Sequence, residues 1–110
     1  MTWYQKIIAA HTAVTNNVTH GYIGEGERYF VWMEERDEDL TANNRHIERA
    51  MRGTTDLFSR IEFDPWLRQI EQAFDTYEIG WNLSSVQFED ETGYWHYELE
   101  WVVYDGANEV

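Results

Sequence analysis

The sequence YWHYELEWVVY at residues 94–104 carries the clearest structural pattern of this chain. Large apolar side chains occupy alternate positions, and His96, Glu98 and Glu100 lie between them. Because successive side chains of a β-strand point to opposite faces, this alternation predicts a strand with one buried face. The residues expected on that face are Trp95, Tyr97, Leu99, Trp101 and Val103.

The segment before this strand predicts a helix followed by the first arm of a hairpin. Residues 81–88 form that arm, and the turn is expected at 89–93. Asp64 is suited to cap the helix and Pro65 to occupy its first position, while Gly80 is expected to stop it. Its apolar stripe consists of Trp66, Leu67, Ile70, Ala73, Phe74 and Tyr77.

The first segment of the chain predicts another amphipathic helix. Thr2 and Gln5 have the spacing of a capping box, and the turn signal Asn16-Asn17 is expected to end the helix. Apolar residues recur at helical spacing between these limits, namely Trp3, Tyr4, Ile7, Ile8 and Val14.

Three strands are expected between the two helices, over residues 18–23, 27–35 and 47–58. Gly53 lies inside the third strand, which indicates a bulge or a close backbone approach.

A chain of 110 residues is expected to form one domain over residues 1–110. The element order predicts the α+β class, with an antiparallel or mixed β-sheet and two helices packed on one face. Residues 34–44 are expected to form an exposed acidic loop, and residues 106–110 a frayed polar tail.

Composition excludes several classes of protein. The formal net charge is −13, with 21 Asp plus Glu against eight Lys plus Arg, so ordinary binding to nucleic acid or anionic lipid is disfavoured. The chain contains no cysteine, which removes disulfide frameworks and thiolate metal sites. No apolar run approaches the roughly 18 residues of a membrane span, so no membrane partner is expected.

No catalytic or cofactor motif is found in the sequence, so no enzymatic activity, cofactor or metal is expected. The four histidines lack metal-ligand spacing, and the acidic groups at 37–39 and 89–91 lack the pattern of a calcium loop. His11 is interpreted as a packed, hydrogen-bonded core residue. His96 is interpreted as a solvated surface residue.

The element order and three short segments resemble the tail-completion, or tail-terminator, proteins of long-tailed bacteriophages. These segments are DLFS at 56–59, FDP at 63–65 and the hairpin ETGYWHYELEW at 91–101. The resemblance implies a virion protein, assembled in the host cytoplasm, that forms a hexameric ring on the tail tube. Such a ring stops tail polymerisation and offers a surface to the head–tail connector, while DNA only passes through its lumen.

The expected partners are therefore other copies of the chain, the tail-tube protein and the connector. The eighteen aromatic residues exceed what two helices and a sheet must bury, and Tyr and Trp are common in interfaces. The predicted oligomer or partner interface comprises Asp37, Glu38, Asp39, Asn43, Asn44, Arg45, Arg49, Arg52, Tyr94 and Tyr104.

Two alternatives remain open from the sequence. An acidic mimic of DNA that inhibits a host nuclease or DNA-binding protein would explain the net charge. The arginines at 45–60 interrupt a continuous negative stripe, so this hypothesis ranks second. A small hydrolase would need a pair of carboxylates whose geometry the sequence does not reveal.

Overall fold

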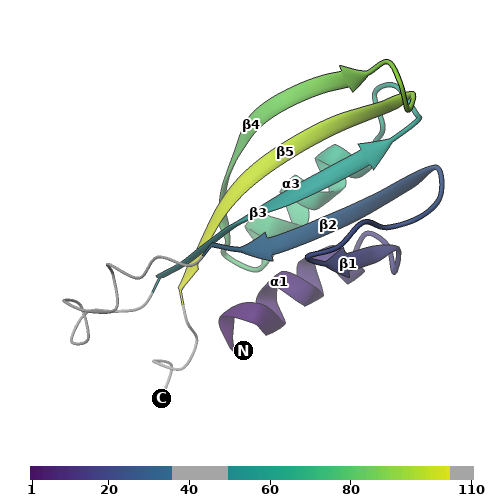
Figure 1. Cartoon of the computed structure of the whole chain (residues 1–110). Helices are drawn as coiled ribbons and strands as arrows, with labels where there is room; N and C mark the ends of the chain where they lie inside the picture. The colour runs from purple at the N-terminus through teal and green to yellow at the C-terminus, as the bar shows by residue number, and fades with distance from the viewer. Residues whose placement is uncertain (36–49, 105–110) are drawn as a thin grey trace.

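The computed structural model describes residues 1–35 and 50–104, which form five strands and two helices. In chain order the elements are α1 (Trp3–Thr12), β1 (Val18–His20), β2 (Arg28–Glu34), β3 (Ala50–Ser59), α3 (Trp66–Thr76), β4 (Gly80–Glu89) and β5 (Tyr94–Tyr104). The strands form one mixed sheet in the order β1-β2-β3-β5-β4, with only the β1–β2 pair parallel (Figure 1). The predicted α+β fold is confirmed.

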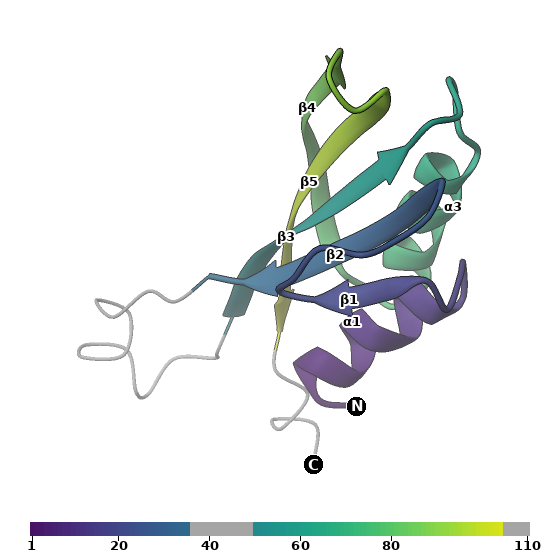
Figure 2. The same cartoon turned by 45° about the vertical axis from the view of Figure 1, so that its right-hand side comes forward.

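Both helices pack on one face of the sheet, and the other face is open (Figure 2). The core lies between the two layers. From the sheet it includes Phe30, Leu57, Leu99, Trp101 and Val103, and from the helices Ile7, Ala10, Ile70 and Phe74. The buried face predicted for β5 is confirmed, because Tyr97, Leu99, Trp101 and Val103 are at most 6% exposed and Trp95 packs against the core.

The predicted capping box begins α1. The Gln5 backbone N–H donates to Thr2 Oγ1 at 3.3 Å, and the Thr2 N–H donates to Gln5 Oε1 at 2.9 Å. The helix ends at Thr12, four residues before the predicted stop. Tyr4 and Ile8, expected in the apolar stripe, are 46% and 45% exposed. At about 100° per residue they lie at the edge of the stripe, and Ala10 and His11 occupy the buried positions instead.

The predicted start of α3 is confirmed to within one residue. Pro65 stands at the N-cap with helical dihedral angles, and the Asp64 carboxylate accepts the Trp66 backbone N–H at 2.9 Å. The predicted stop at Gly80 is wrong, because Gly80 begins β4. The residue that takes the left-handed conformation is Glu78, with φ of 58°. Hydrogen bonds from Glu78 N–H to Asp75 and from Ile79 N–H to Phe74 close a Schellman motif around it.

Replacing Glu78 with glycine is therefore expected to stabilise the domain by about 0.5–1 kcal/mol, because glycine adopts positive φ without a Cβ clash. Part of the gain is lost to the greater entropy of glycine in the unfolded chain. Urea denaturation of both proteins measures the difference. A variant less stable than the parent would show that Glu78 makes a compensating contact.

Gly53 allows β2 and a tryptophan ring to approach the backbone of β3 closely. Of the two predicted alternatives, a bulge or a close backbone approach, the structure therefore shows the second. A Cβ at this position would lie 2.4 Å from the Met33 carbonyl oxygen and 2.4 Å from the Trp101 ring. The pairing of β3 is regular at this point, and the irregularity of the sheet lies in β4 between Leu83 and Ser85.

The other strand boundaries differ slightly from the predicted ones. β1 ends at His20, because Gly21 leaves the strand with φ of 81°. β2 ends at Glu34, one residue before its predicted end, and Glu34 is also the first residue of the predicted acidic loop. Residues 36–44 of that loop, the predicted start of β3 at 47–49 and the tail at 106–110 lie outside the described residues. No described helix is long and apolar enough to cross a membrane.

Candidate subunit interface

Of the ten residues predicted at an interface, the structure describes Arg52, Tyr94 and Tyr104. Arg52 and Tyr104 are exposed near one end of the open sheet face, whereas Tyr94 lies at the other end of β5. The structure therefore does not bring the three residues together. The remaining seven lie outside the described residues, namely Asp37, Glu38, Asp39, Asn43, Asn44, Arg45 and Arg49.

Tyr94 makes its contacts within its own chain. Its hydroxyl donates to the Gly26 carbonyl at 2.8 Å, and its ring meets those of Tyr29 and Phe58 edge-on. The Arg60 guanidinium lies 4.6 Å from the centre of the Tyr94 ring. These contacts tie the β1–β2 connection and the end of β3 to β5, so Tyr94 is half-buried.

His96 is not the solvated residue that the sequence suggested. Its Nε2 lies 2.8 Å from Asp56 Oδ1, its Nδ1 lies 3.5 Å from Glu89 Oε2, and its ring stacks on Phe58 with centroids 4.2 Å apart. The hydrogen bond with Asp56 is the main reason why the pKa of His96 is raised; the carboxylates of Glu89 and Glu98 act in the same direction and burial opposes them. The carboxylates come from β3, β4 and β5, which sequence spacing does not reveal.

Because the pKa of His96 is higher in the folded state, its contribution to stability is complete below the unfolded value of about 6.5. It disappears as the pH rises through the folded-state pKa. The difference in unfolding free energy between the parent and His96→Gln is therefore expected to be larger at pH 6 than at pH 9. Chemical denaturation at both pH values measures it, and an equal difference at both would contradict the assignment.

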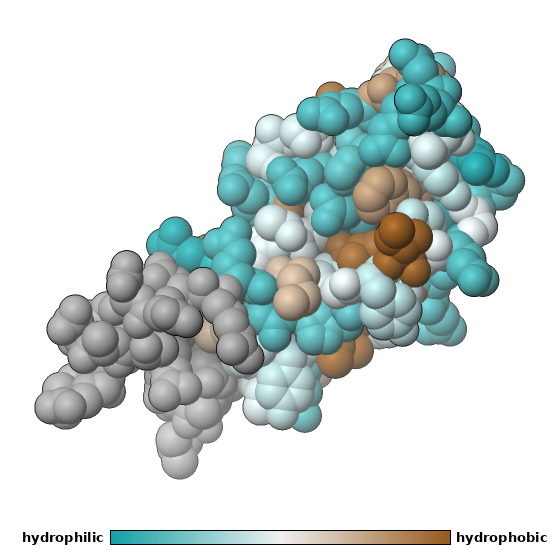
Figure 3. All heavy atoms as spheres, viewed as in Figure 1, coloured by the Kyte–Doolittle hydropathy of each residue, from teal (hydrophilic) through white to brown (hydrophobic). Residues whose placement is uncertain are grey.

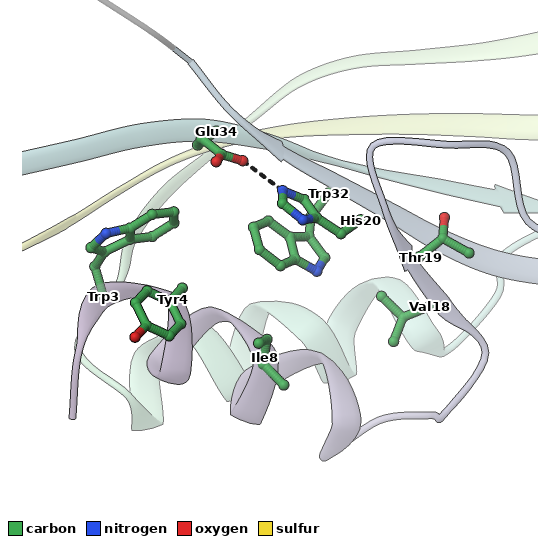
Figure 4. Close-up of a pocket in the computed structure, with 8 residues that line it drawn as sticks. All are labelled: Trp3, Tyr4, Ile8, Val18, Thr19, His20, Trp32 and Glu34. Carbon is green, nitrogen blue, oxygen red and sulfur yellow. Dashed lines mark hydrogen bonds and ion pairs between the residues drawn. The ribbon is translucent and has the colours of Figure 1, made fainter.

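A groove lies between α1 and the β1–β2 edge of the sheet (Figure 4). We call it the α1 groove; its volume is about 440 Å³, and its lining residues are Trp3, Tyr4, Ile8, Val18, Thr19, His20, Trp32 and Glu34. His20 stacks on Trp32 at a centroid distance of 3.9 Å, and its Nε2 lies 2.6 Å from Glu34 Oε1. The aromatic and aliphatic side chains line a hollow with a single acidic group at its margin.

A second apolar surface lies near the opposite edge of the sheet, where the β3–α3 connection meets the edge strand β4. We call it the Phe63 surface, after its most exposed member. Phe63 is 86% exposed, Val86 and Phe88 are each 48% exposed, and the Phe88 ring contacts Trp95 at 4.9 Å. The segment that joins β3 to α3 lies at the far end of the sheet from the N-terminus of α1 in both views (Figures 1 and 2).

Phe63 is held outward by a strained but well-supported backbone. Its φ is 56°, in the left-handed region that is unfavourable for an aromatic residue. This conformation is about 1–2 kcal/mol less stable than the right-handed one. The next residue, Asp64, is buried and fixes the connection: its carboxylate accepts from Arg28 through two nitrogens, from Ser59 Oγ at 2.6 Å and from the Trp66 N–H. Phe63 belongs to the FDP segment at 63–65, but its outward position is not predicted from the sequence, because residue types do not reveal the sign of φ.

The open face has a different character. Figure 3 shows it as mostly hydrophilic, with hydrophobic side chains gathered near β1 and β2. In the β1–β2 connection and in β2, the exposed large hydrophobic residues include Tyr22, Ile23 and Met33, at 68%, 81% and 49%. Within residues 1–35 and 50–104, no group of three or more His, Asp or Glu side chains is placed to hold a metal ion.

No protein-family model and no curated protein matches this sequence.

Proposed function

We propose that this chain is a structural, non-enzymatic virion protein of a long-tailed bacteriophage. Copies of it form a ring that caps the tail tube, ends tail polymerisation and provides the surface for head attachment. The observation that carries the proposal is the pair of separate apolar surfaces, the α1 groove and the Phe63 surface, near opposite edges of the sheet.

A ring requires such a pair. Rings are built from heterologous contacts, in which one patch of a subunit meets a different patch of the next. The α1 groove adjoins β1 and β2, whereas the Phe63 surface includes residues of β4, the strand at the other edge of the sheet. Residues 80–88 carry no charged side chain in a chain whose net charge is −13, so this edge approaches another copy with little local repulsion.

The overall charge predicts how assembly depends on salt. Each subunit adds a formal charge of −13, so self-repulsion opposes association of the free protein and salt screens it. We expect the mean mass by light scattering to rise between about 20 and 300 mM NaCl, and tail tubes to capture the protein at their ends. A protein that stays monomeric at every concentration and salt and ignores tube ends would overturn the proposal.

The open face supports the DNA-mimic hypothesis as a second candidate, because it presents Asp56, Glu89, Glu98 and Glu100 on adjacent strands. Arg52 shares that face and His96 lies among the carboxylates, so the negative surface is interrupted. Salt separates the two functions. Binding of a mimic to a basic protein weakens steeply as salt rises, whereas self-association of this chain is expected to strengthen.

A further inference from the structure

We propose that Phe63 of one subunit inserts into the α1 groove of the next copy and that Arg68 beside it pairs with Glu34 at the groove margin. This inference rests on the proposed ring and specifies its repeating contact. It is carried by the shape of the two surfaces, by their charges and by the strained conformation of Phe63.

The projecting residue is unusual in two respects. Phe63 is the most exposed large apolar side chain among the described residues, and its backbone has a positive φ that costs stability in the isolated subunit. The buried Asp64 network fixes the backbone next to Phe63, so this side chain projects from an ordered segment. A preorganised aromatic anchor of this kind is typical of residues that dominate an interface.

The receiving groove has a suitable size and lining. Benzene fills a cavity of about 150 Å³, so a groove of about 440 Å³ can take the phenyl ring together with parts of its neighbours. Trp3, Tyr4 and Trp32 present aromatic faces and edges, and Phe63 would meet them in the tilted or edge-on geometry that aromatic pairs favour. Figure 4 shows these side chains around the hollow, with Glu34 at its upper margin.

Charge favours a second copy as the occupant. Arg68 lines the hollow beside Phe63, its side chain is 79% exposed, and its Nε lies 3.5 Å from Glu71 Oε1, which is a weak contact. Glu34 lines the α1 groove and already pairs with His20, but a carboxylate accepts from more than one donor. Insertion of Phe63 therefore places one of the chain's few cations near a carboxylate.

The contact is expected to be weak for a single pair of subunits. Phe63, Val86 and Phe88 offer roughly half of the 800 Å² per partner that a stable interface needs. Such a contact becomes stable when a ring closes or when the tail tube holds neighbouring subunits together, because later contacts are then intramolecular.

Engineered cysteines test the geometry directly, because the natural chain has none. Glu62→Cys lies beside Phe63, and Tyr4→Cys lies at the rim of the α1 groove. Under mild oxidation the double variant is expected to give a ladder of disulfide-linked oligomers, and the two single variants mixed together only dimers. Dimers from Glu62→Cys alone, or no crosslink in a sample that light scattering shows to be oligomeric, would overturn the insertion.

Two glycine variants separate association from folding. Phe63→Gly relieves the positive φ and removes the side chain, so we expect a subunit at least as stable as the parent but at least tenfold weaker in self-association. Glu78→Gly is the matched control, because it relieves a φ of 58° at a residue that lines neither the α1 groove nor the hollow beside Phe63, and it is expected to leave association unchanged. Normal association of Phe63→Gly would contradict the insertion.

The ion pair is tested by charge reversal. Arg68→Glu and Glu34→Arg are each expected to weaken association several-fold, and the double variant to recover most of the loss. Failure of the double variant to recover would remove the Arg68–Glu34 pairing. Parent oligomers that are unaffected by all of these changes would disprove this contact while leaving the ring intact, whereas a parent that never associates, even with tail tubes, would disprove the ring itself.

Discussion

Replacing Asp64 with alanine is expected to lower the unfolding free energy by about 3–5 kcal/mol, the usual cost of removing one member of a buried ion pair. The Asp64 side chain is fully buried and accepts hydrogen bonds from Arg28, from Ser59 and from the Trp66 backbone. Alanine would leave the Arg28 guanidinium, which is 27% exposed and lies over the Trp66 ring, without its carboxylate.

The Asp64 prediction has a control two residues away. Glu62→Ala removes an exposed carboxylate from the same connection and is expected to change stability by no more than about 0.5 kcal/mol. Urea denaturation of the parent and both variants gives the comparison. Similar stabilities for Asp64→Ala and the parent would mean that the network does not support the connection that presents Phe63.

Acid is expected to destabilise the protein through His11, by about 3 kcal/mol between pH 7 and pH 4. The imidazole is completely buried between α1 and the sheet. Its Nδ1–H donates to the Ile7 carbonyl at 2.7 Å, so Nε2 is the acceptor for the Thr55 hydroxyl at 2.9 Å. The same hydroxyl oxygen accepts the Trp101 indole N–H at 3.0 Å, which completes a satisfied buried network.

Burial lowers the pKa of His11 from 6.5 to about 4, against the smaller opposing effect of its hydrogen bond to Ile7. As the pH falls below about 6.5, the unfolded chain binds a proton that the folded chain does not, so stability is lost down to about pH 4. His11→Gln is expected to be less stable than the parent at pH 7 and to lose less stability on acidification. The pKa of His96 is raised and not lowered, so protonation of His96 adds to stability. His96→Gln is therefore not expected to reduce the loss of stability on acidification.

Denaturation of the parent and the two histidine variants at pH 7, 6, 5 and about 4.5 measures these contributions. A His11→Gln variant whose stability runs parallel to that of the parent across this range would disprove the assignment. Protonation of carboxylates that do not contact the replaced histidine is common to all three proteins and cancels in the differences.

Local patterns predicted most of the fold. The alternation in residues 94–104, the capping box at Thr2 and the Asp64-Pro65 helix start each depend on neighbours within a few positions, and each is confirmed. The predicted end of α3 at Gly80 was wrong because the preference for glycine after a helix is only a tendency. The C′ position falls on Glu78, and the buried Ile79 fixes the chain direction beyond it.

The candidate interface was less accessible to sequence reasoning. Tyr94 was identified as an aromatic residue on the polar face of its strand, but its contacts come from Gly26, Tyr29 and Phe58. The α1 groove and the Phe63 surface lie at the boundary of the area of the sheet that the two helices cover. No short segment of the chain encodes that boundary.

Residue order alone specified an acidic α+β domain, the two helices, the closing hairpin and the buried role of His11, because side-chain periodicity and capping are local properties. The fold in three dimensions set the partners of His96, the outward position of Phe63 and the hollow beside α1. The reason is that these features join residues far apart in the chain, such as Asp56 and His96, which are 40 positions apart.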